Sequence, residues 1–258
     1  MASRADPAAL PASPTLRGAL RSAATDFYFH SWRLLPANVL WAAVSLLLLG
    51  VAVLVPGLIV LLPLAALPIA GIFRMATRIV RGESVSFWDG LDAWRGEVRP
   101  ALALGAGLLV AALILGFNVI SGLLTGTVVG WAFATLAFWG LVATWLYAWV
   151  AWPILMDSAR AAMPARRRLR LAALLLLAHP VRLAGLGLIL FALCLLSVAA
   201  IVPLLTVTVS FAALVSTRMV LPAADRFEAR YSGAAPVRAV ESGPVVAESR
   251  PVETAARP

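Results

Sequence analysis

The chain has 258 residues, of which 62% are hydrophobic and only 13% are charged, and its mean hydropathy is +0.94. Soluble domains contain about 45–50% apolar and about 25% charged residues, so this composition indicates an integral membrane protein. All 21 basic residues are arginine and the net charge is +9, but the arginines flank long apolar stretches, so we expect no nucleic-acid partner. The single cysteine, Cys194, excludes an internal disulfide and a cysteine-rich metal site.

Three long stretches contain no charged residue, at 34–73, 101–156 and 183–217. A helix needs about 20 residues to cross the hydrocarbon, so each stretch is long enough for two spans. The dividing points are VPG at 55–57, SGLLTGT at 121–127 and Pro203. The predicted spans are 34–55, 57–80, 100–121, 127–154, 181–201 and 204–222.

Two spans per stretch place every charged residue on one side of the membrane, as the positive-inside rule favours. We therefore predict an all-α, polytopic membrane helix bundle over 19–230, built as three hairpins joined by cytoplasmic amphipathic segments. Residues 1–18 are expected to form a flexible lead-in and 231–258 a disordered tail, with both termini cytoplasmic. The lack of lysine and the abundance of alanine suggest a GC-rich bacterium, and hence a bacterial cell membrane.

Prolines interrupt the second span at Pro63 and Pro68, so we expect a helix kink there. Such a kink is either a hinge that lines a substrate path or an ordinary membrane-helix proline.

The amphipathic segment between the second and third spans, SVSFWDGLDAWRGEVRP, is the candidate docking helix. Its apolar side chains recur at helical spacing and its acids fall on the other side. Ser86 followed by Asp89 resembles a capping box at the start of the helix. A docking role and a purely structural elbow are both compatible with the pattern. The candidate residues are Phe87, Leu91, Trp94 and Val98 on the apolar face, together with Trp88, Asp89 and Asp92.

The segment 164–179 is strongly basic and precedes the fifth span. We expect its arginines to contact anionic phospholipid headgroups, each contributing about 1 kcal/mol, although they could serve only to set the topology. The candidates are Arg166, Arg167, Arg168 and Arg170.

Polar side chains within the spans are few, and none at the helix centres is ionisable. They are expected to bond between helices or back to the backbone; a conduit lined by Asn118 and the 206–210 ridge is an alternative. The candidates for intramembrane polar contacts are Asn38, Asn118, Thr206, Thr208 and Ser210.

Signatures of catalysis are missing from the sequence. His30 and His179 are the two histidines of the sequence and precede different spans, so a metal site is not indicated, and neither a phosphate-binding loop nor a nucleophile motif occurs. We therefore expect no enzymatic activity, no metal and no cofactor.

Several segments resemble the bacterial YesL-type membrane proteins (the DUF624 family). They are RLLPANVLWAAVSLLLLG with Asn38, RIVRGESVSFWDGLDAWRGEVRPALALG with Arg81, Gly82 and Glu83, AWPILMD, and LRLAALLLLAHPVRLAGLGLIL. The resemblance covers roughly 19–230, although LPIAG stands where the family usually has a proline–threonine–glycine step. It implies an association with carbohydrate uptake, a sugar-uptake permease as a partner, and no particular reaction.

The leading hypothesis is therefore an accessory or regulatory component associated with carbohydrate uptake. The alternatives are a passive or substrate-selective transport conduit and a structural membrane protein with no ligand. The sequence does not determine an oligomeric state.

Overall fold

The computed structural model describes residues 15–200 and 204–232, and within these ranges the fold is all-α, with eight α-helices and no strand. Six segments are long and apolar enough to cross a membrane. The prediction of an all-α, polytopic membrane bundle is therefore confirmed. The six segments are Leu16–Leu54, Gly57–Val80, Val98–Leu124, Val128–Met156, Pro180–Ala200 and Thr206–Arg230.

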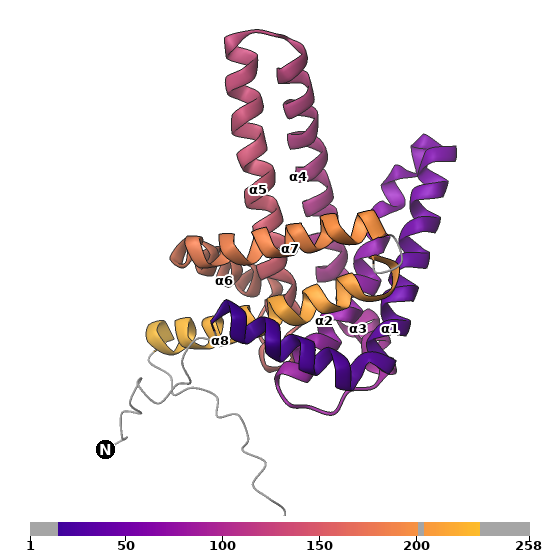
Figure 1. Ribbon diagram of the computed structural model, residues 1–258, viewed down its shortest axis with the longest axis vertical. Helices are drawn as coiled ribbons and strands as arrows, with labels where there is room; N and C mark the ends of the chain where they lie inside the picture. Colours follow the sequence, from indigo (N-terminus) through magenta and orange to yellow (C-terminus); the bar gives the residue numbers. More distant parts are fainter. Residues whose placement is uncertain (1–14, 201–203, 233–258) are drawn as a thin grey trace, which may run out of the picture.

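The helices follow one another with short connections (Figure 1). In chain order the elements are α1 (Leu16–Leu54), the 3₁₀ helix η2 (Pro56–Ala65), α2 (Ala66–Val80), α3 (Phe87–Gly96), α4 (Val98–Leu124), α5 (Val128–Met156), the 3₁₀ turn η3 (Ser158–Arg160), α6 (Ala165–Ala178), α7 (Pro180–Ala200), the π-helical η4 (Leu204–Thr208) and α8 (Val209–Ser232).

The first span begins earlier than predicted, because α1 continues without interruption from Leu16. Thr15 caps this helix, since its hydroxyl accepts a hydrogen bond of 3.2 Å from the Gly18 amide. Residues 16–18 are therefore helical rather than part of a flexible lead-in, while 1–14 lie outside the described residues. Pro36 lies inside α1, which bends in Figure 1, as expected where a proline removes one backbone hydrogen bond.

The second span changes its helix type near the two prolines that predict a kink. Pro63 lies inside the 3₁₀ helix η2, and Pro68 lies in the first turn of α2, where a missing amide hydrogen costs little. The span is thus a 3₁₀ helix joined to an α-helix instead of one kinked α-helix.

Helices α4 and α5 form an upright hairpin that projects from the rest of the molecule (Figure 1). Its turn lies at Thr125–Thr127, inside the predicted SGLLTGT break, and Gly126 adopts a φ of 63°, a conformation that favours glycine. Thr127 caps α5 by accepting a hydrogen bond of 3.1 Å from the Gly130 amide.

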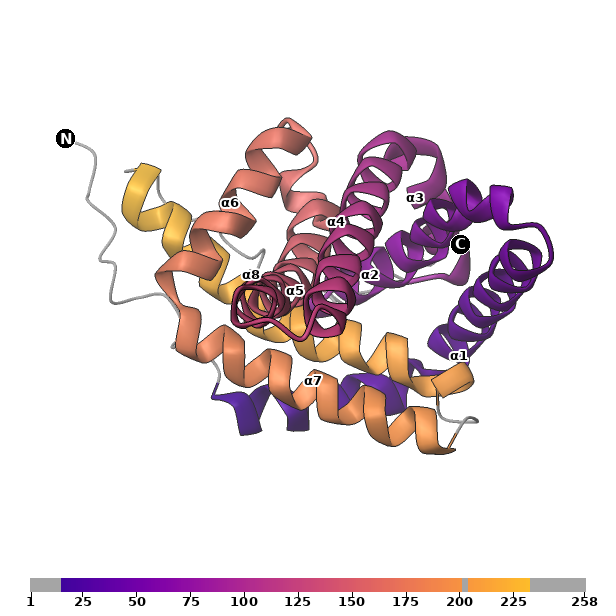
Figure 2. The ribbon, with the colours of Figure 1, turned by 90° about the horizontal axis from the view of Figure 1, so that it is seen from above.

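The third pair of apolar helices has a different orientation from α4 and α5. Seen from the side and from above, α7 and α8 run across the base of the upright hairpin (Figures 1 and 2). Helix α8 packs mainly against α1, α2 and α5, and it continues to Ser232, well beyond the predicted end at 222. Pro203, the predicted turn, lies outside the described residues, as do residues 233–258 of the predicted tail.

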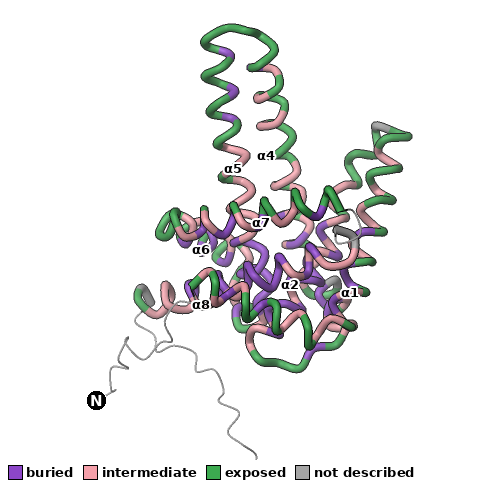
Figure 3. The backbone as a smooth tube through the Cα atoms, in the orientation of Figure 1, coloured by how far each residue is buried: buried purple, intermediate pink, exposed green. Residues whose placement is uncertain are grey.

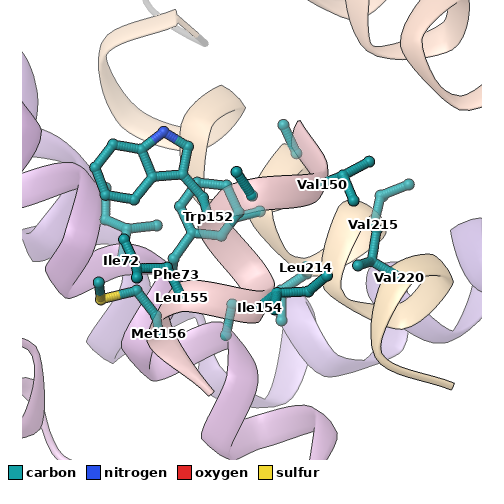
Figure 4. Packing of buried hydrophobic residues seen from close by; sticks show 14 of the residues in the cluster. Ile72, Phe73, Val150, Trp152, Ile154, Leu155, Met156, Leu214, Val215 and Val220 are labelled. Atoms are coloured by element: carbon teal, nitrogen blue, oxygen red, sulfur yellow. The ribbon is translucent and has the colours of Figure 1, made fainter. Parts of the chain in front are cut away.

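The core lies where α2, the end of α5 and α8 meet, below the upright hairpin (Figures 3 and 4). The rings of Phe73 and Trp152 stack there with a centroid separation of 6.0 Å, and Leu214 is fully buried. Most large apolar side chains of the hairpin's outer half are instead exposed. An exposed apolar surface of this extent is expected for a protein that faces lipid.

Candidate functional site

Five charged side chains meet at the base of the bundle and form what we call the charged cluster. Arg81 follows α2, Asp157 and Arg160 belong to the turn after α5, and Asp225 and Glu228 lie one turn apart on α8. Three separate parts of the chain therefore converge on one set of ion pairs.

The guanidinium groups of Arg81 and Arg160 each bind more than one carboxylate of the cluster. Arg81 bonds Asp157 at 2.7 and 3.3 Å and Asp225 at 2.8 and 3.0 Å. Arg160 bonds Asp157, reaches Asp225 at 2.6 Å and reaches Glu228 at 2.7 and 3.1 Å. Such bidentate guanidinium–carboxylate pairs are among the strongest and most directional polar contacts in proteins.

Burial makes this network sensitive to the loss of any member. The side chain of Asp157 is 0% exposed and that of Arg160 is 3% exposed. Burial by itself lowers the pKa of Arg81, but its hydrogen bonds to Asp225 and Asp157 outweigh that effect and hold the pKa above its usual range. Burial also lowers the pKa of Arg160, and its bonds to Glu228 and the charge of Asp225 reverse the effect, so that its pKa is raised as well.

The ion pairs of the cluster hold three helix ends together. Arginine does not release its proton in proteins, and each carboxylate of the cluster already accepts hydrogen bonds from guanidinium groups. The cluster therefore fixes the ends of α2, α5 and α8 relative to one another.

Sequence reasoning missed this cluster because it placed these charges on one side of the membrane without pairing them with one another. Apart from Asp157 and Arg160, which are three residues apart, the pairs join residues 65 to 144 positions apart, as in Arg160 with Asp225 and Arg81 with Asp225. A partial signal exists, since Asp225 and Glu228 share one helix face at i, i+3. Their partners could not be deduced from it.

Side chains also bind the last carbonyls of α5, which have no partner within the helix. Arg74 and Thr77 from α2 both donate to the Met156 carbonyl, at 3.1 and 3.2 Å. Arg168 donates to the Leu155 carbonyl and pairs with Glu97 at 3.0 and 3.1 Å. The end of α5 is thus held by side chains of α2 and α6.

These contacts correct one predicted lipid contact. Arg168 is buried and turned into the protein, because it lies on the same face of α6 as Leu171 and Leu175, which are also buried. The remaining three candidates, Arg166, Arg167 and Arg170, are exposed.

Helix α3, the candidate docking helix, packs against α2 and is bound to it by an ion pair. The predicted capping box is present: Ser86 accepts a bond from the Trp88 amide at 3.3 Å, and Asp89 accepts one from the Ser86 amide at 2.6 Å. Asp89 also pairs with Arg78 at 2.6 Å. Its carboxylate therefore has a structural role.

The backbones of α2 and α3 approach closely where Gly71 faces Gly90. A Cβ added at Gly71 would lie 2.8 Å from the Gly90 carbonyl oxygen, closer than such atoms can approach. Gly90 and Ala93 are buried in this crossing, while Phe87 and Leu91 are only half-buried.

The outward side of α3 differs in part from the prediction. Trp88 is 68% exposed, and Asp92 is exposed beside Arg95 at 3.6 Å. Val98 does not extend the apolar face of α3, because the helix ends at Gly96 and Val98 begins α4. The side chain of Trp94 lies outside the described part of the structure.

The polar candidates within the spans separate into two groups. Asn38 accepts bonds from the Ser210 amide at 2.9 Å and from the Ser210 hydroxyl at 3.2 Å, and Thr208 donates to Ser197 at 2.6 Å. Thr206 is half-buried nearby in the chain, whereas Asn118 is exposed on α4. The structure therefore does not bring Asn118 together with the ridge around Ser210.

Comparison of the chain with protein-family models, with curated proteins and with solved structures gives no match. The similarity to YesL-type proteins is carried by the sequence motifs alone and stays a prediction.

Proposed function

We propose that this protein is a non-catalytic accessory or regulatory component of a membrane assembly, which binds a partner protein through the outward side of α3 at the cytoplasmic face. The proposal rests on two observations: α3 is held in a fixed position, and it exposes the tryptophan Trp88. Trp88 is 68% exposed, although α3 itself is fixed by a capping box and the Asp89–Arg78 ion pair.

A helix fixed in this way loses little conformational freedom when a partner binds, which favours affinity. Tryptophan is also enriched among the residues that dominate binding energy at protein interfaces. Asp92 and Arg95 lie beside Trp88 on the same short helix and would supply a polar rim.

The conduit hypothesis has less support. It requires Asn118 to share a path with Thr208 and Ser210, yet Asn118 is exposed while Thr208 and Ser210 are buried in contacts with other helices. The link to carbohydrate uptake and to a sugar-uptake permease rests on the resemblance to YesL-type proteins, and it enters the proposal on that basis alone.

Site-specific photo-crosslinking in intact membranes tests the proposal. A photoreactive residue at Trp88 should capture a membrane permease or its associated ATPase as a discrete adduct. The matched control is Tyr28, which is 76% exposed on α1 and should not give that adduct. Adducts with lipid alone from Trp88, or the same protein adducts from both positions, would contradict the proposal.

A further inference from the structure

A groove between α6 and α8 combines an apolar floor with two arginines at its mouth, at the same end of the bundle as the charged cluster. Its cavity volume is about 220 Å³. The lining residues are Met163, Leu171, Leu174 and Phe227, which are apolar, and Arg167, Arg170 and Glu228, which are charged.

The arginines of the groove are available for a ligand. Arg167 and Arg170 are exposed, and neither takes part in an ion pair within the described residues. The one acid of the groove, Glu228, is already bound to Arg160 at 2.7 Å. Arg160 is shared with Asp157 and Asp225, so Glu228 still offsets part of the positive charge, but the two arginines outnumber the one acid of the lining and leave a net positive charge that suits an anion.

The apolar residues that line the groove determine which kind of anion fits it. Leu171, Leu174 and Phe227 give an apolar surface that a small inorganic ion cannot use, but that an acyl chain can cover. Typical pockets for whole ligands measure about 300–1,000 Å³, so this smaller groove suits part of a lipid whose remaining chain stays in the bilayer. Helix α6 connects the ends of the two apolar helices α5 and α7, so the groove lies where the chain leaves the apolar spans.

From this geometry we propose that the α6–α8 groove is a binding site for an anionic phospholipid, with its phosphate between Arg167 and Arg170 and an acyl chain over Leu174 and Phe227. The site goes beyond the predicted headgroup contacts, since it separates two binding arginines from Arg166, which is exposed outside the groove, and from the buried Arg168. It is independent of the docking proposed for α3.

Native mass spectrometry of the purified full-length protein, titrated with phosphatidylglycerol or with phosphatidylcholine of the same chains, tests the site. The wild type should bind phosphatidylglycerol preferentially. R167Q and R170Q should each weaken that binding about fivefold and the double variant about thirtyfold, since each basic residue near a headgroup contributes a similar increment. R167K/R170K, which keeps the charge, should retain most of the binding.

The matched control is R166Q, on the same helix but outside the groove, which should change the affinity less than twofold. Far-UV circular dichroism of every variant checks that the helices are intact, since all three arginines are exposed. A loss in R166Q equal to that in the double variant, or equal binding of both lipids, would overturn the proposal.

A second arm separates the lipid from a free phosphate. Leu174→Asn should weaken phosphatidylglycerol binding while leaving both arginines in place, because it removes apolar contact from the floor. Inorganic phosphate should not displace the lipid at comparable concentration. Displacement by phosphate, together with no effect of Leu174→Asn, would show that the groove binds an anion without its chain and would refute the lipid assignment.

Discussion

Replacement of Asp157 by asparagine tests the charged cluster most sharply. The carboxylate of Asp157 is fully buried and accepts hydrogen bonds from Arg81 and Arg160. Asparagine has nearly the same volume, but it removes the negative charge and turns an amide donor toward two guanidinium groups. The substitution thus isolates charge from packing.

The expected loss of stability depends on the partners that the two arginines keep when Asp157 is replaced. Removal of one member of a buried ion pair costs about 3–5 kcal/mol, because the other charge stays buried without compensation. Here Arg160 keeps Asp225 and Glu228, and the Arg81 side chain is 25% exposed and can recover some hydration. We therefore expect a loss at the lower end of that range, about 3 kcal/mol in the free energy of unfolding.

The assay is equilibrium unfolding in mixed detergent micelles, followed by circular dichroism. The control is Asp92→Asn, which removes an exposed pair and should change the free energy by less than about 0.5 kcal/mol. A double-mutant cycle of Asp157→Asn with Arg81→Gln should give a coupling of about 1–3 kcal/mol. Equal changes in the free energy of unfolding for the two aspartate substitutions, together with a coupling energy near zero, would show that the charged cluster does not hold the helix ends together.

Three further substitutions test the packing between helices. Gly71→Ala should separate α3 from α2 at Gly90, destabilise the protein by about 1–3 kcal/mol and reduce any crosslinking from α3. Asn38→Ala should cost about 1–2 kcal/mol in micelle unfolding, because the Ser210 amide loses its acceptor. Ser216→Ala should cost about 1–3 kcal/mol in the same assay, because Ser216 donates to the α5 carbonyl that the proline of that helix leaves without its usual amide donor.

Each of these substitutions has a matched control at an open or exposed position. A Cβ at Gly107 would meet nothing within 4 Å, Asn118 is exposed, and the exposed Thr135 bonds only within its own helix. Alanine at any of the three should change the free energy by less than about 0.5 kcal/mol. A control that destabilises as much as its test substitution would show that the contact has no special role.

Much of the fold could be predicted from local features. Charge-free stretches gave the number of spans, small residues gave the turn at Thr125–Thr127, and the spacing of Ser86 and Asp89 gave the cap of α3. Each of these features acts over a few residues or depends only on hydrophobicity, so no knowledge of the tertiary structure is needed.

The parts that could not be predicted depend on contacts between distant segments. The continuity of α1 through Pro36 and the length of α8 follow from packing around the core rather than from local preference. The inward direction of Arg168 was accessible in principle, because Leu171 and Leu175 share its helix face. The partner of Arg168, Glu97, lies 71 residues away and no local pattern reveals it.

We predict that the charged cluster, α3 and the α6–α8 groove lie on the cytoplasmic side of the membrane, and that the turns of the first two hairpins lie on the other side. Cysteine labelling in intact cells tests it most directly, after replacement of Cys194, the single native cysteine. Cysteines at Leu54 and Leu124, which are 82% and 81% exposed at the two turns, should react with an impermeant maleimide, whereas one at Ala162, in the exposed turn before α6, should react only after the cells are opened. Labelling of Ala162→Cys in intact cells, or protection of both turn positions, would contradict the account.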